Sequence, residues 1–68
     1  MTHKMIRLPT VIEQTGLSRS SIYLRMKNNK FPQSISLGDR AIAWLEEDIN
    51  QWIEDKIIES KSSGANHE

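Results

Sequence analysis

Residues 8–27, LPTVIEQTGLSRSSIYLRMK, decide the fold, because they predict two short helices joined by a tight turn. Pro9 suits a first helical turn, where the amide hydrogen that proline lacks would have no partner. Gly16 can adopt the left-handed conformation that ends a helix. Ser18 follows as an N-cap whose hydroxyl can accept a hydrogen bond from the amide of residue 20 or 21. This arrangement predicts a helix-turn-helix, whose second helix typically enters the major groove of DNA.

The second helix, predicted at residues 18–28, has an apolar and a polar face. At about 100° per residue, Ile22 and Met26 share the inner face, with Ser18 and Arg25 at its flanks. The inner face is expected to pack against Val11, Ile12 and Leu17. The outer face carries Arg19, Ser20, Tyr23, Leu24 and Lys27. Such a mixture suits the major groove, because arginine can bond a guanine edge, hydroxyls reach bases or phosphates, and an apolar group can meet a thymine methyl.

Two residues of the outer face have more than one interpretation. Tyr23 belongs either to the DNA-facing surface or to the edge of the core. Leu24 is a thymine contact, a packing partner of the hairpin that follows, or an exposed side chain without a role. Arg19 and Lys27 also have an alternative interpretation as ordinary solvated charges, because most surface charges on helices do nothing specific. The turn before the helix and the segment after it are what favour DNA binding.

That following segment predicts a β-hairpin at residues 34–44, SISLGDRAIAW. The second helix is expected to end near Asn28 and Asn29, and Phe31-Pro32 then redirects the chain, with Phe31 covering the edge of the core. Apolar residues alternate with serine or alanine on both sides of the turn Gly38-Asp39-Arg40. A hairpin directly after a recognition helix is a wing. Arg40 at its tip either reaches a phosphate or the minor groove, or serves solubility alone.

The rest of the chain supplies a third helix and two tails. Acidic residues 46–48 follow Leu45 and favour a helix start, since negative charge complements the exposed amides there. An apolar stripe then follows, expected to close the core: Ile49, Trp52, Ile53 and Ile57. Ile58 falls outside it. Residues 4–8 predict a short extended piece with Ile6 and Leu8 turned inward. We expect one mainly α domain at residues 4–59, three helices plus a two-stranded wing, between disordered residues 1–3 and 60–68.

Composition and charge limit the class of protein. The 68 residues allow one small domain with a limited core. The sequence contains no cysteine, no apolar run of membrane length and no signal-peptide pattern. We therefore expect a cytoplasmic, nucleoid-associated protein. The zero net charge hides an asymmetry: residues 1–40 hold seven basic and two acidic residues, net +5, and residues 41–68 hold the reverse, net −5. Such a division suggests that the basic part faces a polyanion.

No pattern in the chain suggests catalysis. His3 and His67 lie in opposite tails, no histidine or cysteine pair has ligand spacing, and no glycine-rich phosphate loop is present. The acidic run at residues 46–48 fits a helix start better than a metal cluster. We therefore expect no enzyme, no catalytic residue, no metal site and no cofactor.

Together, these features resemble the AlpA family of prophage regulatory proteins over residues 6 to about 57. The motifs that carry the resemblance are Arg7-Leu8-Pro9, Thr15-Gly16-Leu17-Ser18-Arg19-Ser20-Ser21-Ile22-Tyr23, Phe31-Pro32, Leu37-Gly38-Asp39-Arg40, Trp44-Leu45 and Trp52-Ile53. The resemblance implies a winged helix-turn-helix of the excisionase and MerR-like type, and a DNA-binding regulator of a mobile element. The family often has an arginine directly after the tyrosine, whereas here Leu24 stands there and Arg25 follows.

Six residues are expected to contact double-stranded DNA. Arg19, Ser20 and Tyr23 would touch bases or nearby phosphates, and Lys27, Lys30 and Arg40 would hold the backbone. One such module buries only about 600–1,000 Å² against DNA, so dimers or several copies on repeated sites are expected, with the acidic third helix as one contact surface. Three roles stay open: a transcriptional activator or repressor, an excision factor that bends DNA for an integrase, and an adaptor that binds an integrase, RNA polymerase or another protein.

Overall fold

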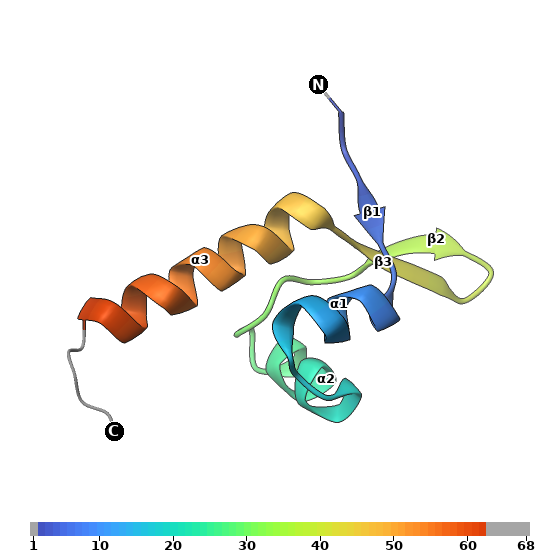
Figure 1. Cartoon of the computed structure of the whole chain (residues 1–68). Coiled ribbons are helices and arrows are strands. Elements are labelled where there is room, and N and C mark those ends of the chain that lie inside the picture. The colour runs from blue at the N-terminus through green and yellow to red at the C-terminus, as the bar shows by residue number, and fades with distance from the viewer. Residues whose placement is uncertain (1, 63–68) are drawn as a thin grey trace.

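The computed structural model describes residues 2–62 and contains three helices and three strands. In chain order these are β1 (Met5–Ile6), α1 (Leu8–Thr15), α2 (Arg19–Lys27), β2 (Ile35–Gly38), β3 (Ala41–Leu45) and α3 (Glu46–Ser62). The β2–β3 hairpin and α3 project from opposite ends of the body, and α1 and α2 pack together beside the sheet (Figure 1). The prediction of a mainly helical fold with a small hairpin wing is confirmed.

The sheet has one more strand than the predicted wing. The short extended piece near the N-terminus pairs with β3 as β1, in the antiparallel order β1-β3-β2, with Ile6 opposite Trp44. The Glu46 amide extends this contact by donating to the Lys4 carbonyl at 2.8 Å. The prediction that Leu8 belongs to the extended piece is wrong: Leu8 begins α1, because Pro9 favours a first helical turn directly after it. β1 thereby ties the N-terminus to the base of the wing.

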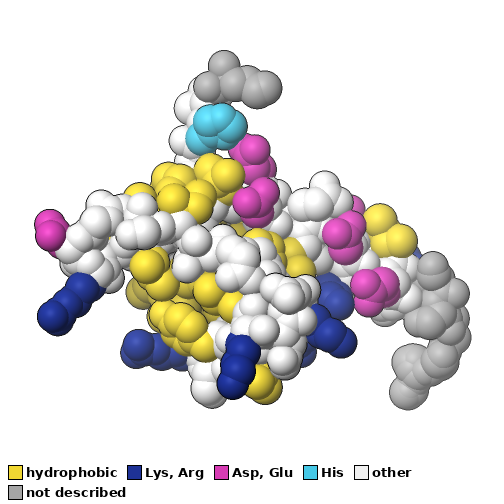
Figure 2. Space-filling model, turned by 180° about the vertical axis from the view of Figure 1, so that it is seen from behind, with side chains coloured by type: hydrophobic (Ala, Val, Ile, Leu, Met, Phe, Trp, Pro, Cys, Tyr) yellow, Lys and Arg dark blue, Asp and Glu magenta, His cyan; other side chains and the backbone are white. Residues whose placement is uncertain are grey.

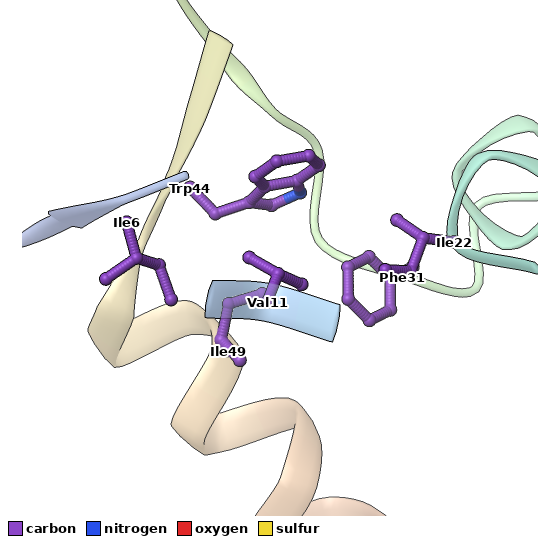
Figure 3. Close-up of a cluster of buried hydrophobic side chains, with 6 residues drawn as sticks. All are labelled: Ile6, Val11, Ile22, Phe31, Trp44 and Ile49. Atoms are coloured by element: carbon purple, nitrogen blue, oxygen red, sulfur yellow. The ribbon is translucent and has the colours of Figure 1, made fainter. Parts of the chain in front are cut away.

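Six buried side chains form the core, one from each helix, two from strands and one from the loop after α2 (Figure 3). They are Ile6, Val11, Ile22, Phe31, Trp44 and Ile49. Partly buried apolar residues pack around them: Leu8, Ile12, Leu17, Met26, Ile42, Trp52 and Ile53. The predicted inward packing of Ile22 and Met26 is confirmed. Because each helix contributes to one shared cluster, the orientation of α2 depends on the whole core.

The junction between α1 and α2 has the predicted local chemistry. Gly16 has φ +74°, and its amide donates to the Ile12 carbonyl at 2.8 Å. The Thr15 hydroxyl accepts from the Leu17 amide at 3.2 Å, which holds the turn. The Ser18 hydroxyl caps α2 by accepting from the amide of Ser21 at 3.2 Å. These bonds satisfy helix-end groups that would otherwise lack partners, and they set where α2 starts.

The end of α2 is a Schellman motif. Asn29 takes the left-handed conformation at φ +58°, its amide donates to the Met26 carbonyl, and the Lys30 amide donates to the Arg25 carbonyl at 2.7 Å. The helix therefore ends as predicted, at the two asparagines.

Two tryptophans hold the segment that follows α2. The indole Nε1 of Trp44 donates to the Pro32 carbonyl, and that of Trp52 donates to the Lys30 carbonyl, both at 3.0 Å. Phe31 is buried, and its ring meets the Trp52 ring edge-on with centroids 5.0 Å apart. The predicted structural role of Phe31 is confirmed. The segment links the second helix to both the wing and α3.

The C-terminal half of α3 extends past the body. The stripe expected to close the core holds for Ile49, Trp52 and Ile53 but is wrong for Ile57, which is 45% exposed. Ile57 lies near the C-terminal end of α1, which stops at Thr15, so α1 covers its side chain only in part. The helix itself continues to Ser62, three residues beyond the predicted end at residue 59. Residues 63–68 of the predicted tail, and residue 1 of the predicted lead, lie outside the described residues. Within residues 2–62, no helix combines the length and apolar character that a membrane crossing requires.

Candidate nucleic-acid interface

The outer face of α2 is the candidate interface, and its composition matches the prediction. All five predicted outer residues are exposed: Arg19, Ser20, Tyr23, Leu24 and Lys27. On the inner face Ile22 is fully buried, and Met26 and Arg25 are half-buried. The sequence of α2, RSSIYLRMK, contains three basic residues and no acidic one. The helix therefore presents a polar, cationic surface to solvent on the side away from the core.

Arg19 and Tyr23 form a pair on this surface. The Arg19 guanidinium lies 5.7 Å from the centre of the Tyr23 ring, a cation–π contact between residues one helical turn apart. Tyr23 is 37% exposed and lies outside the buried cluster, so its ring is sheltered by the arginine and not by the core alone. This contact orients the guanidinium. Because it restricts the rotamers of the free Arg19 side chain, the side chain has fewer rotamers to lose when it binds a partner.

Ser20 stands with Arg19 in the first turn of α2. Its hydroxyl is exposed and lies 3.5 Å from the hydroxyl of the capping residue Ser18. The N-terminal end of a helix carries partial positive charge from its aligned peptide dipoles. Arg19 and Ser20 therefore add a charge and a hydroxyl to an end that already favours anions.

Lys27 and Lys30 continue the exposed basic surface at the other end of α2. Both side chains are exposed. The main chain at Lys30 is held twice, since its amide donates to the Arg25 carbonyl and its carbonyl accepts from Trp52. A flexible lysine side chain thus projects from a fixed backbone position.

Arg40 lies at the tip of the wing, in a tighter turn than predicted. Gly38 is the last residue of β2, and the turn consists of Asp39 at φ +45° and Arg40 at φ +67°. Two successive left-handed residues match the twist of a hairpin, but glycine and asparagine favour this conformation far more than arginine does. Arg40 is exposed, so its side chain does not compensate for the strained backbone by packing.

The predicted contact residues have no acidic partners in the described part of the chain. The ion pairs among residues 2–62 join Lys4 to Glu46 and Lys56 to Glu59, and Glu47 makes a hydrogen bond with the ring of His3. Dark blue lysine and arginine side chains project from the lower side of the molecule in Figure 2, while most magenta acidic side chains lie higher or to the right, over α3. On this face of the molecule, most basic side chains therefore lie apart from the acidic side chains of α3.

Two features were left open or missed by sequence reasoning. Leu24 is 60% exposed, which contradicts the interpretation that it packs against the wing. Arg25, predicted at the flank of the inner face, is half-buried, and its Nε is buried without a hydrogen-bond partner in the described residues. The acidic start of α3 is confirmed, and no group of three or more potential ligands that could hold a metal ion occurs within residues 2–62.

The fold and this surface together define a winged helix-turn-helix protein with a cationic second helix. The chain belongs to the AlpA family, since the model described as prophage CP4-57 regulatory protein (AlpA) matches residues 4–57. The family resemblance noted from the motifs is thus confirmed, and the family consists of regulators.

Two curated relatives are similar over most of the chain. Uncharacterized protein ORF88 of Enterobacteria phage P4 is 36% identical over 58 residues, which cover 85% of this chain and 66% of the relative. The DNA-binding transcriptional activator AlpA of Escherichia coli strain K12 is 36% identical over 56 residues, which cover 74% of this chain and 80% of the relative. The chain therefore spans slightly less than two thirds of the length of ORF88.

Proposed function

We propose that this protein binds double-stranded DNA sequence-specifically and regulates transcription within a prophage or other mobile element, at the nucleoid of the cytoplasm. One observation carries the proposal: the outer face of α2 is exposed, cationic and rich in hydroxyls, on a helix whose inner face is locked into the core. Membership of a family of prophage regulators, and similarity to a relative named a DNA-binding transcriptional activator, support it.

In the proposed complex, α2 enters the major groove and the β2–β3 hairpin acts as the wing. Arg19, Ser20 and Tyr23 contact base edges or the nearest phosphates, with Arg19 oriented by its stacking on Tyr23. Lys27, Lys30 and Arg40 contact the phosphate backbone and set the register of the helix on the duplex. Because these cations lack acidic partners among residues 2–62, binding breaks no internal ion pair.

The salt dependence of binding tests the proposal. The bound site is first isolated by selection from a random DNA pool, and fluorescence anisotropy then gives affinity against salt concentration. Each phosphate neutralised steepens the slope of log K against log salt by about 0.9. The double variant Lys27→Ala/Lys30→Ala is expected to reduce the slope by about 1.8.

A matched control separates local contacts from net charge. Lys4→Ala/Lys61→Ala removes the same charge outside the proposed interface, from side chains exposed at the N-terminus and on α3. This variant should keep nearly the whole slope. A wild-type slope near zero would disprove DNA binding, and equal effects of the two double variants would disprove the assigned backbone contacts.

We further propose that the protein acts as a dimer or as several copies on DNA, with α3 contacting a second copy, an integrase or RNA polymerase. The exposed apolar residues Ile57 and Ile58, at 45% and 57%, and the acidic residues around them support this use of α3. Sedimentation with and without DNA tests it. Strictly one-to-one binding of a monomer to an isolated site would contradict multimer formation, and a DNA-bending assay beside a promoter reporter distinguishes regulation from an excision role.

A further inference from the structure

Leu24 occupies the centre of the outer face of α2. It lies two residues from the fully buried Ile22, which at about 100° per residue places it roughly 160° around the helix from the core. Ser20 and Lys27 flank it, one turn before and one turn after. At 60% exposed it is the most exposed large apolar residue in the described chain. Any surface against which α2 docks therefore meets Leu24 among its first contacts.

Neither the core nor the wing covers Leu24. The side chains around it indicate which kind of partner would cover it. The surrounding side chains are basic or carry hydroxyls, and α2 has no acidic residue. The charge of this face complements a polyanion and would oppose a second copy docking through the same basic surface. The occupant that the charge favours is thus the duplex itself. In the major groove the bases present hydrogen-bond donors and acceptors, and the only apolar group is the C5 methyl of thymine.

We propose that Leu24 contacts the C5 methyl group of a thymine in the bound site and is a specificity-determining residue for that base pair. The inference rests on the proposed function, because it requires α2 to lie in the major groove. Arg19 and Lys27 on either side would hold the helix against the phosphates while Leu24 reaches the methyl group. Burial of one methyl group corresponds to roughly a fourfold gain in affinity.

Replacement of thymine by deoxyuridine tests the inference, because it removes only the methyl group and leaves the base pairing and the other major-groove atoms in place. Each thymine of the selected site is replaced in turn, and the affinity of the wild-type protein is measured by anisotropy. At one or two positions we expect affinity to fall about threefold to fivefold. The same replacements should change the affinity of the Leu24→Ala variant by less than 1.5-fold.

Met5→Ala is the matched control, since it truncates another exposed apolar side chain, which lies on β1 and belongs neither to the outer face of α2 nor to the proposed contact surface of α3. This variant should keep the full deoxyuridine effect. Circular dichroism melting checks that Leu24→Ala retains the wild-type fold, which its exposure predicts.

The outcomes separate this inference from the proposed function. If the protein binds the selected site with a steep salt slope but no deoxyuridine replacement weakens binding, the Leu24 contact is wrong and DNA binding stands. If the deoxyuridine effect persists in Leu24→Ala, another residue contacts the methyl group and the inference is also wrong. If no duplex is bound with a salt-dependent affinity, the proposed function itself fails.

Discussion

Replacing Arg40 by glycine is expected to stabilise the fold and weaken DNA binding at once. Arg40 has φ +67° in the two-residue turn of the wing and no packing that compensates for it. The left-handed conformation costs a non-glycine residue roughly 1–2 kcal/mol, whereas glycine adopts it freely. Glycine also makes the unfolded chain more flexible, which offsets about 0.5–1 kcal/mol. The net gain is about 0.5–1 kcal/mol, or roughly 2–8 °C in melting temperature for a domain of this size.

The same substitution removes one proposed phosphate contact. The slope of log K against log salt should fall by about 0.9, which at 0.1 M salt corresponds to roughly an eightfold loss of affinity. Thermal melting followed by circular dichroism measures the first effect, and anisotropy titrations at several salt concentrations measure the second. Arg40→Lys keeps the charge and the strained backbone, so its stability and salt slope should both stay close to the wild type.

Two results would refute this reasoning. A melting temperature of Arg40→Gly below that of the wild type would mean that the arginine stabilises the turn through its side chain. An unchanged salt slope would mean that the tip of the wing does not approach a phosphate, and Arg40 would then serve solubility alone.

Two further predictions, each with a comparison variant, concern the cap of α2 and the two tryptophans. Ser18→Ala removes the hydroxyl that accepts from the Ser21 amide, so the free energy of unfolding measured by urea denaturation should fall by about 1 kcal/mol. Ser18→Asp should lose little stability, because aspartate also caps helices. Equal losses in the two variants would contradict the capping role. Trp44→Phe should cost about 2–4 kcal/mol, since it leaves a gap in the core and the Pro32 carbonyl without its donor. Trp52→Phe, at a half-buried position, should cost only about 1 kcal/mol, and the reverse order would overturn the assigned core.

The local structure of the helix-turn-helix was predictable because its causes lie within a few residues. The left-handed Gly16, the Ser18 cap and the asparagines after α2 each act through hydrogen bonds to backbone groups no more than five positions away. The faces of α2 follow from helical periodicity alone. For the same reason the exposure of the candidate contact residues was predictable before any tertiary contact was known.

In the wing, hydrophobic periodicity alone does not predict which residues face the core. Apolar residues alternate along both β2 and β3, and the alternation does not say which set faces the core. The register decides it: Ser36 lies opposite Ile42 on the face that packs on the core, whereas Ile35 lies opposite Ala43 on the other face, where Ala43 is buried but Ile35 is 37% exposed. A shift in the pairing between Ser36 and Gly38 accompanies this register. Ile35 and Leu37 consequently remain 37% and 50% exposed.

By itself, the sequence determined two helices with a capped turn, a hairpin, an acidic third helix and a cationic outer face on α2, because hydrogen bonds and periodicity within single elements specify them. Only the tertiary structure decided that β1 pairs with β3, that Ile57 remains outside the core, and that the wing leaves Leu24 uncovered. These outcomes depend on contacts between residues far apart in the chain. Their energies arise only when the helices and the sheet enclose a common core.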